Sequence, residues 1–283
     1  MIKLAIPNKG RICNDIVRLL EKIGLEVPEN GRKLYVNTNN PNIQIVYVRA
    51  ADIPLYIQSG VADIGITGED MIQESGAVVE KLLKLNFGSC KIAVAAPKDK
   101  LKSSEYTGGL KVATKLVNIS KRYFADRNKF VEIVRLAGAV ELAPALGIAD
   151  IIVDQVSTGT TLAENNLEII DVLFTSDLYL VANTKSMVDK EKEIDEIKIS
   201  IESVITAEDK RYVMANVSSE ENLQKVISSV PSMDSPTVLN LAKKGEYAIH
   251  TVIDSKELIP TIRKMKRAGA KDILVMNMSR VVE

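Results

Sequence analysis

The chain has 283 residues, 37 basic and 37 acidic side chains and a single histidine. This length is enough for two or three domains of ~100–150 residues each. A net charge of zero, with both signs interleaved, gives no basic face for nucleic acid and no field that would attract an acidic membrane. No apolar run reaches the ~18 residues of a membrane span, and the start MIKLAIPNKGR lacks the apolar core of a signal peptide. We therefore expect a cytoplasmic protein with no nucleic-acid or membrane partner.

The small number of histidine and cysteine residues limits the kinds of metal site and catalytic mechanism that the chain can have. His250 is the only histidine, which excludes a metal site built from several histidines and argues against a Ser-His-Asp hydrolase. Its surroundings, EYAIHTVI, predict a residue within a strand. Cys13 and Cys90 are expected to be reduced, buried thiols.

Short aliphatic segments alternate with amphipathic ones through the first 180 residues. This rhythm predicts a mostly parallel α/β sheet. Helices are expected at residues 10–24 and 50–60. Strands are expected at residues 2–7, 42–49, 62–68, 91–97, 111–116, 131–138, 149–157 and 178–185.

One pattern occurs twice. SGVADIGITGED at residues 59–70 is similar to LGIADIIVDQVSTG at residues 146–159. In both, a helix ends at glycine and a buried strand leads to a polar loop. We interpret the copies as corresponding elements of two similar lobes, although chance similarity of short apolar strings is an alternative. Ligands of open α/β sheets bind at the carboxyl ends of strands, so the two ends would form a cleft.

The pattern changes near the C-terminus. A charge-rich amphipathic helix over residues 189–210 is expected to be a solvated linker. The last 73 residues have the order β-α-β-β-α-β, which is the ferredoxin-like arrangement. Domains of this kind that are appended to enzymes often bind small regulators, but that link is only an analogy between folds.

The segment IIVDQVSTGTTLAEN at residues 151–165 has the form of an anion site. Backbone N–H groups at a helix start and Ser or Thr hydroxyls can hold an anion, and Gly159 lets the backbone close round it. The P-loop lysine is absent, which favours a monophosphate over a triphosphate. Asp154 would repel a phosphate but could accept hydrogen bonds from sugar hydroxyls. The loop thus favours a ribose 5-phosphate, although a strand–turn–helix junction capped by Ser or Thr is also possible.

These residues carry a family resemblance. DQVSTGTTL is similar to the phosphoribosyl pyrophosphate loop of the ATP phosphoribosyltransferases, the first enzymes of histidine biosynthesis. IPNKGR, RAADIPLYIQSGVADIGITGED, ELAPALGIADIIVDQVSTGTTL, VPSMDSPTVLNLA and AGAKDILVMNMSRVVE resemble the other motifs of the long form of this family, so that the match spans almost the whole chain. One departure is Leu116-Val117, where the family usually has an aromatic residue followed by proline.

The resemblance implies a fold and an activity. The fold would be a two-lobed, periplasmic-binding-protein-like catalytic part with a C-terminal ferredoxin-like (ACT-like) domain. Lobe I would comprise residues 1–88 and 176–205, lobe II residues 89–175, and the regulatory domain residues 210–283. The enzyme would transfer phosphoribose to the adenine ring of ATP with Mg²⁺ present and release pyrophosphate. Because adenine is already a nucleophile, positioning and electrostatics can supply most of the catalysis.

The resemblance also implies roles for single residues. No side chain is expected to act as a nucleophile, and Lys9, Arg11 and Asp154 would act by electrostatics and positioning. Lys115 is a weaker phosphate candidate because of the altered loop. The ATP-binding residues would be Lys9, Arg11, Arg49 and Asp70. Phosphoribosyl pyrophosphate would be bound by Glu141, Asp154, Ser157, Thr158, Gly159, Thr160 and Thr161.

Several of these residues also have simpler explanations. Lys9 and Arg11 could be solvated cations, Arg49 could form a surface ion pair with Asp52, and Asp70 could be a helix N-cap. Glu141, which would also be a metal ligand, could be a solvated acid at a helix start.

In the C-terminal domain the resemblance implies a feedback site for histidine at Asp234, Ser235 and Thr237, which could instead form an ordinary turn. It also implies a homo-oligomer, dimer to hexamer, that needs no separate regulatory subunit.

Two other functions are alternatives to this one: a two-lobed solute receptor, and a different phosphoribosyltransferase. Most of the latter have two adjacent acids before the loop, whereas Val153 precedes Asp154 here.

Overall fold

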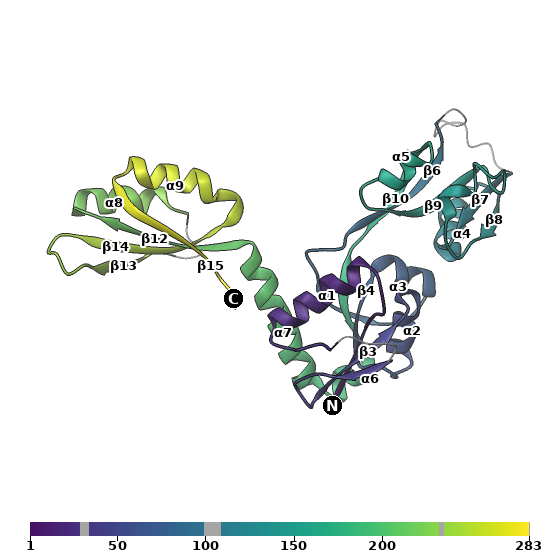
Figure 1. Ribbon diagram of the computed structural model, residues 1–283, viewed down its shortest axis with the longest axis horizontal. Helices are drawn as coiled ribbons and strands as arrows, with labels where there is room; N and C mark the ends of the chain where they lie inside the picture. Colours follow the sequence, from purple (N-terminus) through teal and green to yellow (C-terminus); the bar gives the residue numbers. More distant parts are fainter. Residues whose placement is uncertain (29–33, 99–108, 232–234, 283) are drawn as a thin grey trace. The chain divides into compact units, whose positions relative to one another are not determined.

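The computed structural model describes residues 1–28, 34–98, 109–231 and 235–282. The contacts between residues divide the chain into two units, Met1–Lys198 and Ile199–Glu283. Three sheets are present among the described residues, two in the first unit and one in the second (Figure 1). We call the six-stranded sheet with its helices the first lobe and the five-stranded sheet with its helices the second lobe. The fold class is α/β, two-lobed with a C-terminal ferredoxin-like domain, as predicted.

The first lobe has the strand order β2-β3-β1-β4-β11-β5. Its apolar segments form strands because they are buried on both faces, as in Ile2–Pro7. Proline is tolerated in the first turn of α2, as expected. The elements are β1 (Ile2–Pro7), α1 (Arg11–Lys22), β2 (Tyr35–Asn37), β3 (Ile43–Val48), α2 (Ile53–Gln58), β4 (Ile64–Gly68), α3 (Glu69–Ser75), β5 (Glu80–Lys84) and β11 (Leu178–Ala182).

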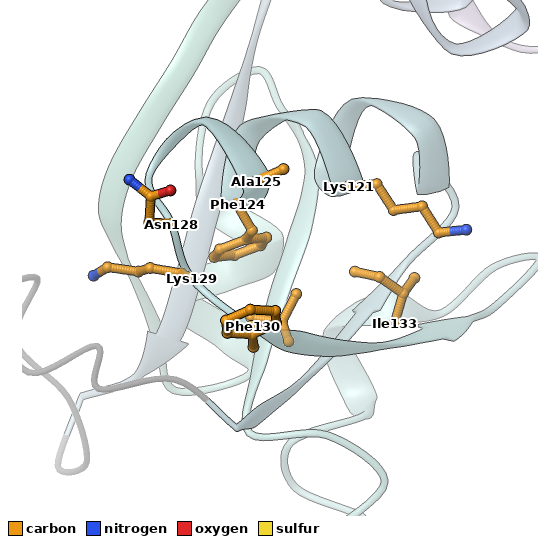
Figure 2. A pocket seen from close by; sticks show the side chains of 8 residues that line it. Lys121, Phe124, Ala125, Asn128, Lys129, Phe130 and Ile133 are labelled. Atoms are coloured by element: carbon orange, nitrogen blue, oxygen red, sulfur yellow. The ribbon is translucent and has the colours of Figure 1, made fainter.

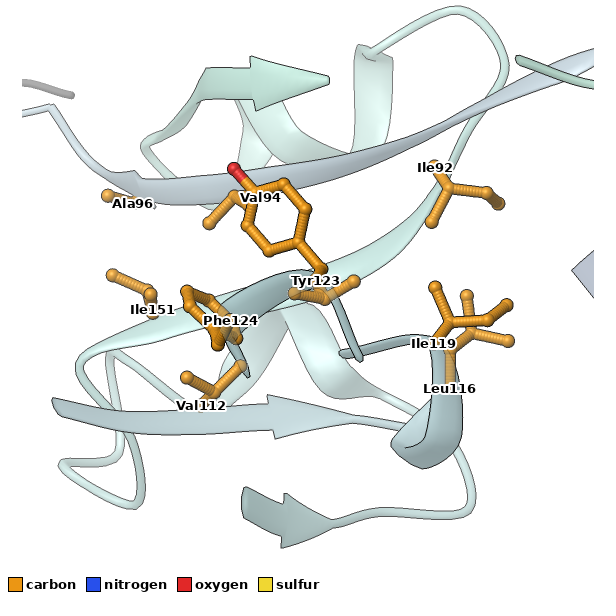
Figure 3. Packing of buried hydrophobic residues seen from close by; sticks show 10 residues of the cluster. Ile92, Val94, Ala96, Val112, Leu116, Ile119, Tyr123, Phe124 and Ile151 are labelled. Carbon is orange, nitrogen blue, oxygen red and sulfur yellow. The ribbon is translucent and has the colours of Figure 1, made fainter. Parts of the chain in front are cut away.

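The second lobe has the strand order β10-β6-β9-β7-β8. Its core is built round Phe124 and Tyr123 of α4, which pack against Ile92, Val94 and Ile151 (Figure 3). The elements are β6 (Cys90–Pro97), β7 (Leu110–Thr114), α4 (Val117–Asp126), β8 (Val131–Arg135), β9 (Ile151–Val156), α5 (Thr160–Glu164) and β10 (Leu167–Ser176).

The two sheets share one topology. In the first lobe, the strands compared are β3-β1-β4-β11-β5, and in the second lobe they are β8-β7-β9-β6-β10. In each of these series the first two neighbouring pairs are parallel and the last two are antiparallel. The expectation of mostly parallel sheets was therefore wrong, because each sheet is mixed. A parallel neighbour needs a crossover of a dozen or more residues. The strands that arrive from the other lobe, β6 and β11, have no such crossover and run antiparallel to their neighbours.

The repeated Ala-Asp-Ile pattern has the same structural role in both lobes. Asp63 precedes β4, and its carboxylate accepts a hydrogen bond from the backbone N–H of Lys3 at 2.8 Å. Asp150 precedes β9, and its carboxylate accepts from the N–H of Lys111, also at 2.8 Å. Each aspartate thus ties the start of its strand to the neighbouring parallel strand. The repeat marks corresponding elements and is not chance similarity.

Asp63 has further partners that have no counterpart at Asp150 among the described residues. The Ser186 hydroxyl donates to Asp63 at 2.7 Å and the Lys190 ammonium lies 2.8 Å away. Burial alone would raise the pKa of Asp63, but the hydrogen bonds from Lys190, Lys3 and Ser186 outweigh it and lower that pKa. Asp63 therefore fastens the segment that leads into α7 (Glu191–Glu208) to the first lobe.

Replacing Asp63 with asparagine is expected to lower the free energy of unfolding at pH 7 by about 2–4 kcal/mol, because Lys190 loses its buried partner. A lowered folded-state pKa stabilises the protein above the unfolded pKa of ~3.9, and this contribution is lost as pH falls through the folded value. The difference in the free energy of unfolding between Asp63→Asn and the parent should thus become smaller below about pH 4. Urea unfolding at several pH values measures it. Asp150→Asn, which removes no described ion pair, is the matched control and should cost about 1 kcal/mol or less; equal losses would contradict the explanation.

The second unit contains a four-stranded antiparallel sheet in the order β13-β14-β12-β15. Helices α8 and α9 cover one face of this sheet, where Val213, Ile249 and Met265 are buried (Figure 1). The elements are α6 (Thr184–Asp189), α7 (Glu191–Glu208), which crosses the boundary between the units, β12 (Lys210–Val217), α8 (Glu220–Ser229), β13 (Thr237–Asn240), β14 (Tyr247–Asp254), α9 (Leu258–Arg267) and β15 (Ala270–Asn277). His250 lies in β14, as predicted. Within the described part of the chain, the helices are too short or too polar to cross a membrane.

Candidate active site

A cavity of about 740 Å³ in the first unit is lined by residues of both lobes. Lys9 and Arg11 reach it from the loop after β1 and the start of α1, and Arg49 from the end of β3. Asp70 enters from α3. The structure thus brings together all four residues predicted to bind the nucleotide. Three cations from the first lobe suit the phosphates of a nucleoside triphosphate.

A second, smaller cavity of about 210 Å³ lies at the end of β9. It is lined by the predicted residues Glu141, Asp154, Ser157, Thr158, Gly159 and Thr161. Thr160 is not among its lining residues, but its hydroxyl is 3.1 Å from that of Thr158. Gln155 and Ser157 line both cavities. The two cavities therefore adjoin along β9.

The loop after β9 is not a capped helix start. Gly159 is the N-cap residue of α5 with φ 81°, a left-handed conformation that favours glycine, and no side chain caps this helix. The capping alternative is thus wrong. Thr158 lines the cavity and is exposed, and its hydroxyl pairs with that of Thr160.

The loop receives its cation from another strand. The Lys115 ammonium lies 3.1 Å from Asp154. Strands β7 and β9 are parallel neighbours with Thr114 opposite Val153, so the next residues, Lys115 and Asp154, emerge side by side. The register of the sheet therefore brings a lysine to a loop that has none of its own. Leu116, where the family pattern departs, is buried in the core of the second lobe.

Asp70 is almost fully buried, with 2% of its surface exposed. Its carboxylate accepts from the Ser176 hydroxyl at 2.7 Å and from the side-chain amide of Gln155. The N-cap of α3 is Gly68, so the N-cap explanation of Asp70 is wrong. A Cβ atom at position 68 would lie 2.2 Å from the Asp70 carboxylate, so only glycine fits there.

A second contact joins the lobes beside the large cavity. The Glu74 carboxylate of α3 accepts from the backbone N–H groups of Asn118 at 2.9 Å and Ile119 at 3.0 Å, at the start of α4. In return, the Arg122 guanidinium donates to the carbonyl of Gln73 at 2.9 Å. A carboxylate at a helix N-terminus and a cation near a helix C-terminus are both favourable. The residues that line the large cavity are thus supported from the second lobe.

Comparison with known proteins decides the family. Residues 49–203 match the family described as ATP phosphoribosyltransferase, and residues 207–280 match the family described as HisG, C-terminal domain. The chain is 42% identical to the ATP phosphoribosyltransferases of Methanosarcina barkeri and Methanocaldococcus jannaschii, over the full length of each. The chain belongs to the ATP phosphoribosyltransferase family. This membership argues against the solute receptor and against a different phosphoribosyltransferase.

A solved structure supports the same family. The ATP phosphoribosyl transferase (HisG:HisZ) complex from Thermotoga maritima contains a chain with 33% identity and a TM-score of 0.65. The match covers 97% of that chain and 71% of this one.

Cys90 was expected to be a buried thiol. It is instead half-buried and borders the large cavity. Burial, followed by the charge of Asp70, raises the pKa of its thiol to about 11. The thiol is thus protonated at neutral pH and is a poor nucleophile. Cys13 is buried as expected.

The described residues contain no group of three or more His, Cys, Asp or Glu side chains that could hold a metal by itself. Glu141 and Asp154 border the same small cavity. One or two carboxylates together with substrate phosphates is the usual arrangement for Mg²⁺. The residues of this ATP phosphoribosyltransferase family member therefore fit a metal that is bound together with its substrate.

Several residues of the large cavity were not predicted. Arg135, at the end of β8, adds a cation, and Gln155 joins the two lobes. Neither has a sequence signal, because only the order of the strands brings them to the cavity. Among the described residues, the side chains of Arg49 and Asp52 do not form the ion pair that was considered for them. The backbone N–H of Asp52 does donate to the Arg49 carbonyl at 2.9 Å.

The candidate regulatory residues lie in the second unit. Thr237 begins β13, an edge strand, and both Ser235 and Thr237 are exposed. Asp234 lies outside the described residues.

A further cavity of about 460 Å³, on the second lobe, is lined by α4 and β8 and includes the exposed ring of Phe130 (Figure 2). It contains none of the predicted site residues.

Proposed function

We propose that the chain transfers phosphoribose from phosphoribosyl pyrophosphate to a ring nitrogen of the adenine of ATP, as the first step of histidine biosynthesis. The observation that carries the proposal is the pair of adjoining cavities, which share Gln155 and Ser157. The larger has the volume and cations for a nucleoside triphosphate, and the smaller has hydroxyls and a carboxylate for a ribose phosphate. Membership of the ATP phosphoribosyltransferase family supports this assignment.

In this proposal the cavities bring two reactants together. Thr158, Thr161 and the backbone after Gly159 hold the 5-phosphate, while Asp154 accepts from ribose hydroxyls. The adenine ring nitrogen attacks the anomeric carbon as the bond from that carbon to pyrophosphate breaks. The nitrogen lone pair supplies the new bond, and pyrophosphate leaves with the electron pair of the old one. Lys9, Arg11 and Lys115 stabilise the phosphates, so that positioning and electrostatics supply most of the catalysis.

The metal of this site is Mg²⁺ in our proposal. Glu141 would hold it together with substrate phosphates. When bound, it neutralises charge on the departing pyrophosphate. The protein side chains keep their roles in orienting the sugar.

Turnover tests the proposal directly. The protein is incubated with ATP, phosphoribosyl pyrophosphate and Mg²⁺, and the products are identified by mass spectrometry. We expect one phosphoribosyl-ATP for each pyrophosphate released. Folded protein that binds both substrates and forms neither product would refute the assignment.

Replacing Thr158 with valine is expected to weaken binding of phosphoribosyl pyrophosphate by about 1–3 kcal/mol, which is the cost of leaving a ligand oxygen without its partner. Titration calorimetry of the variant measures this change. Thr175→Val, at an exposed position of β10 that borders neither cavity, is the control and should bind like the parent. An unchanged affinity of Thr158→Val would mean that the loop does not hold the phosphate.

We further propose that the second unit regulates the enzyme by binding histidine at Asp234, Ser235 and Thr237. The match of residues 207–280 to a C-terminal family domain supports this role. Because the chain carries this domain, we propose that it needs no separate regulatory subunit and forms a homo-oligomer, dimer to hexamer. In the same proposal, residues 1–88 with 176–205 form the nucleotide lobe, residues 89–175 form the phosphoribosyl lobe and residues 210–283 form the regulatory domain. The cytoplasmic location stays a prediction.

A further inference from the structure

We infer that Gln155 is a positioning residue that couples binding in the two cavities, so that a ligand in the phosphoribosyl loop raises the affinity of the other cavity for its nucleotide. This inference rests on the proposed function. Gln155 neither attacks nor protonates a substrate in this role. It acts through the carboxylate of Asp70.

The position of Gln155 supports the inference. It lies on β9 of the second lobe, with an exposed side chain that borders both cavities. Its side-chain amide donates to the carboxylate of Asp70 on α3 of the first lobe, 85 positions away. The bond therefore joins the two lobes at the boundary between the cavities.

The partner of Gln155 is held on its other side. One Asp70 oxygen accepts from the Ser176 hydroxyl at 2.7 Å, and the same hydroxyl accepts from the Asp70 N–H at 3.0 Å. Ser176 ends β10, two residues before the chain returns to the first lobe at β11. Among the described residues, the donor to the second Asp70 oxygen is the side-chain amide of Gln155. Because Asp70 is buried, an oxygen without a donor there would be costly.

The connection to the phosphoribosyl loop is short. Ser157 follows Gln155 by two residues, and Asp154, which is paired with Lys115, directly precedes it. The N–H of Gln155 also donates to the Asp154 carboxylate at 2.8 Å. A phosphate that orders this loop therefore restrains the backbone from which Gln155 reaches Asp70. By linkage, the nucleotide must then strengthen ligand binding in the loop by the same factor.

The test measures the coupling itself. Ribose 5-phosphate is the probe for the loop because it carries no pyrophosphate and cannot react. The dissociation constant of ATP is measured by calorimetry without this probe and at its saturation. For the parent protein we expect ATP to bind about fivefold or more tightly when ribose 5-phosphate is present.

Three variants then assign the coupling to Gln155. Gln155→Leu, of similar size, should bring the factor below about twofold because the interlobe bond is lost. Gln155→Glu should do the same and also weaken ATP binding, since it places a second carboxylate against Asp70. The double variant Asp70→Asn with Gln155→Glu restores an amide–carboxylate pair with the roles reversed. It should recover at least half of the parent's coupling, which a merely structural role of either residue would not predict.

A matched control and the turnover assay separate the outcomes. Gln73→Leu removes another amide–carboxylate bond, 3.0 Å to Glu69 on the same helix, and should keep the parent's factor. A parent with no coupling, or a Gln155→Leu variant with full coupling, overturns the inference while pyrophosphate release from ATP and phosphoribosyl pyrophosphate continues. A parent that binds neither ligand and releases no pyrophosphate overturns the proposed function together with the inference.

Discussion

Replacing Lys115 with methionine is expected to raise the dissociation constant of phosphoribosyl pyrophosphate about 10- to 100-fold. The variant loses a charge-assisted contact of ~1.5–3 kcal/mol to the phosphates. It also leaves the Asp154 carboxylate, which lies 3.1 Å from the Lys115 ammonium, without that partner beside an incoming anion. Both effects weaken binding, so their contributions act in the same direction. Calorimetric titration measures the dissociation constant.

A matched control is available on β7, the strand that Lys115 follows. The ammonium of Lys111 in β7 lies 4.0 Å from Glu132 at the surface, and surface pairs of this kind contribute ~0–1 kcal/mol. Lys111→Met should therefore bind the substrate like the parent. The double variant Lys115→Met with Asp154→Asn should bind more tightly than Lys115→Met alone if repulsion by Asp154 contributes. Unchanged binding by Lys115→Met would show that the loop needs no cation from β7.

The role of Lys115 also shows why a sequence predicts only part of such a site. Strand ends followed by polar residues were visible at Arg49, Asp70 and Asp154, because buried strands and loops differ in composition. Which strand ends meet depends on the strand order and the register. Thr114 lies opposite Val153, and no local pattern in the sequence expresses that pairing. The same reasoning applies to Gln155 and Asp70, which are distant in the sequence.

The strands that the sequence did not reveal have a common physical reason. β5, EKLLK, and β10, LEIIDVLFTS, are partly exposed, and β10 carries two register shifts, so neither has a clean apolar run or alternation. β2 has only three residues. The buried strands β1, β4 and β9 were predicted because both of their faces are covered, which demands continuous aliphatic residues. Burial thus determines how visible a strand is in the sequence.

Removing residues 199–283 is expected to abolish inhibition by histidine while pyrophosphate release from ATP and phosphoribosyl pyrophosphate continues. An inhibitor can shift an enzyme only through a difference in its affinity for two states, and the variant lacks the proposed histidine site. Rates of pyrophosphate release with and without histidine measure the effect. The second unit begins at Ile199, within α7, and Ile201 and Val204 are fully or almost fully buried. The N–H of Val281 also donates to the Ser203 carbonyl at 2.9 Å, so a cut at residue 210 would leave a helical end of the second unit behind.

Substitutions in the full chain locate the effect within the second unit. Ser235→Ala and Thr237→Val each remove one hydroxyl from the proposed histidine site, and each should raise the half-inhibitory concentration of histidine about 5- to 100-fold, corresponding to ~1–3 kcal/mol. Both residues are exposed, so neither change should affect folding or the uninhibited rate. Ser228→Ala, on α8 of the same unit, is the control and should be inhibited like the parent. Inhibition that persists in the shortened chain would place the histidine site in the first unit, because that unit would be the only part left to bind it.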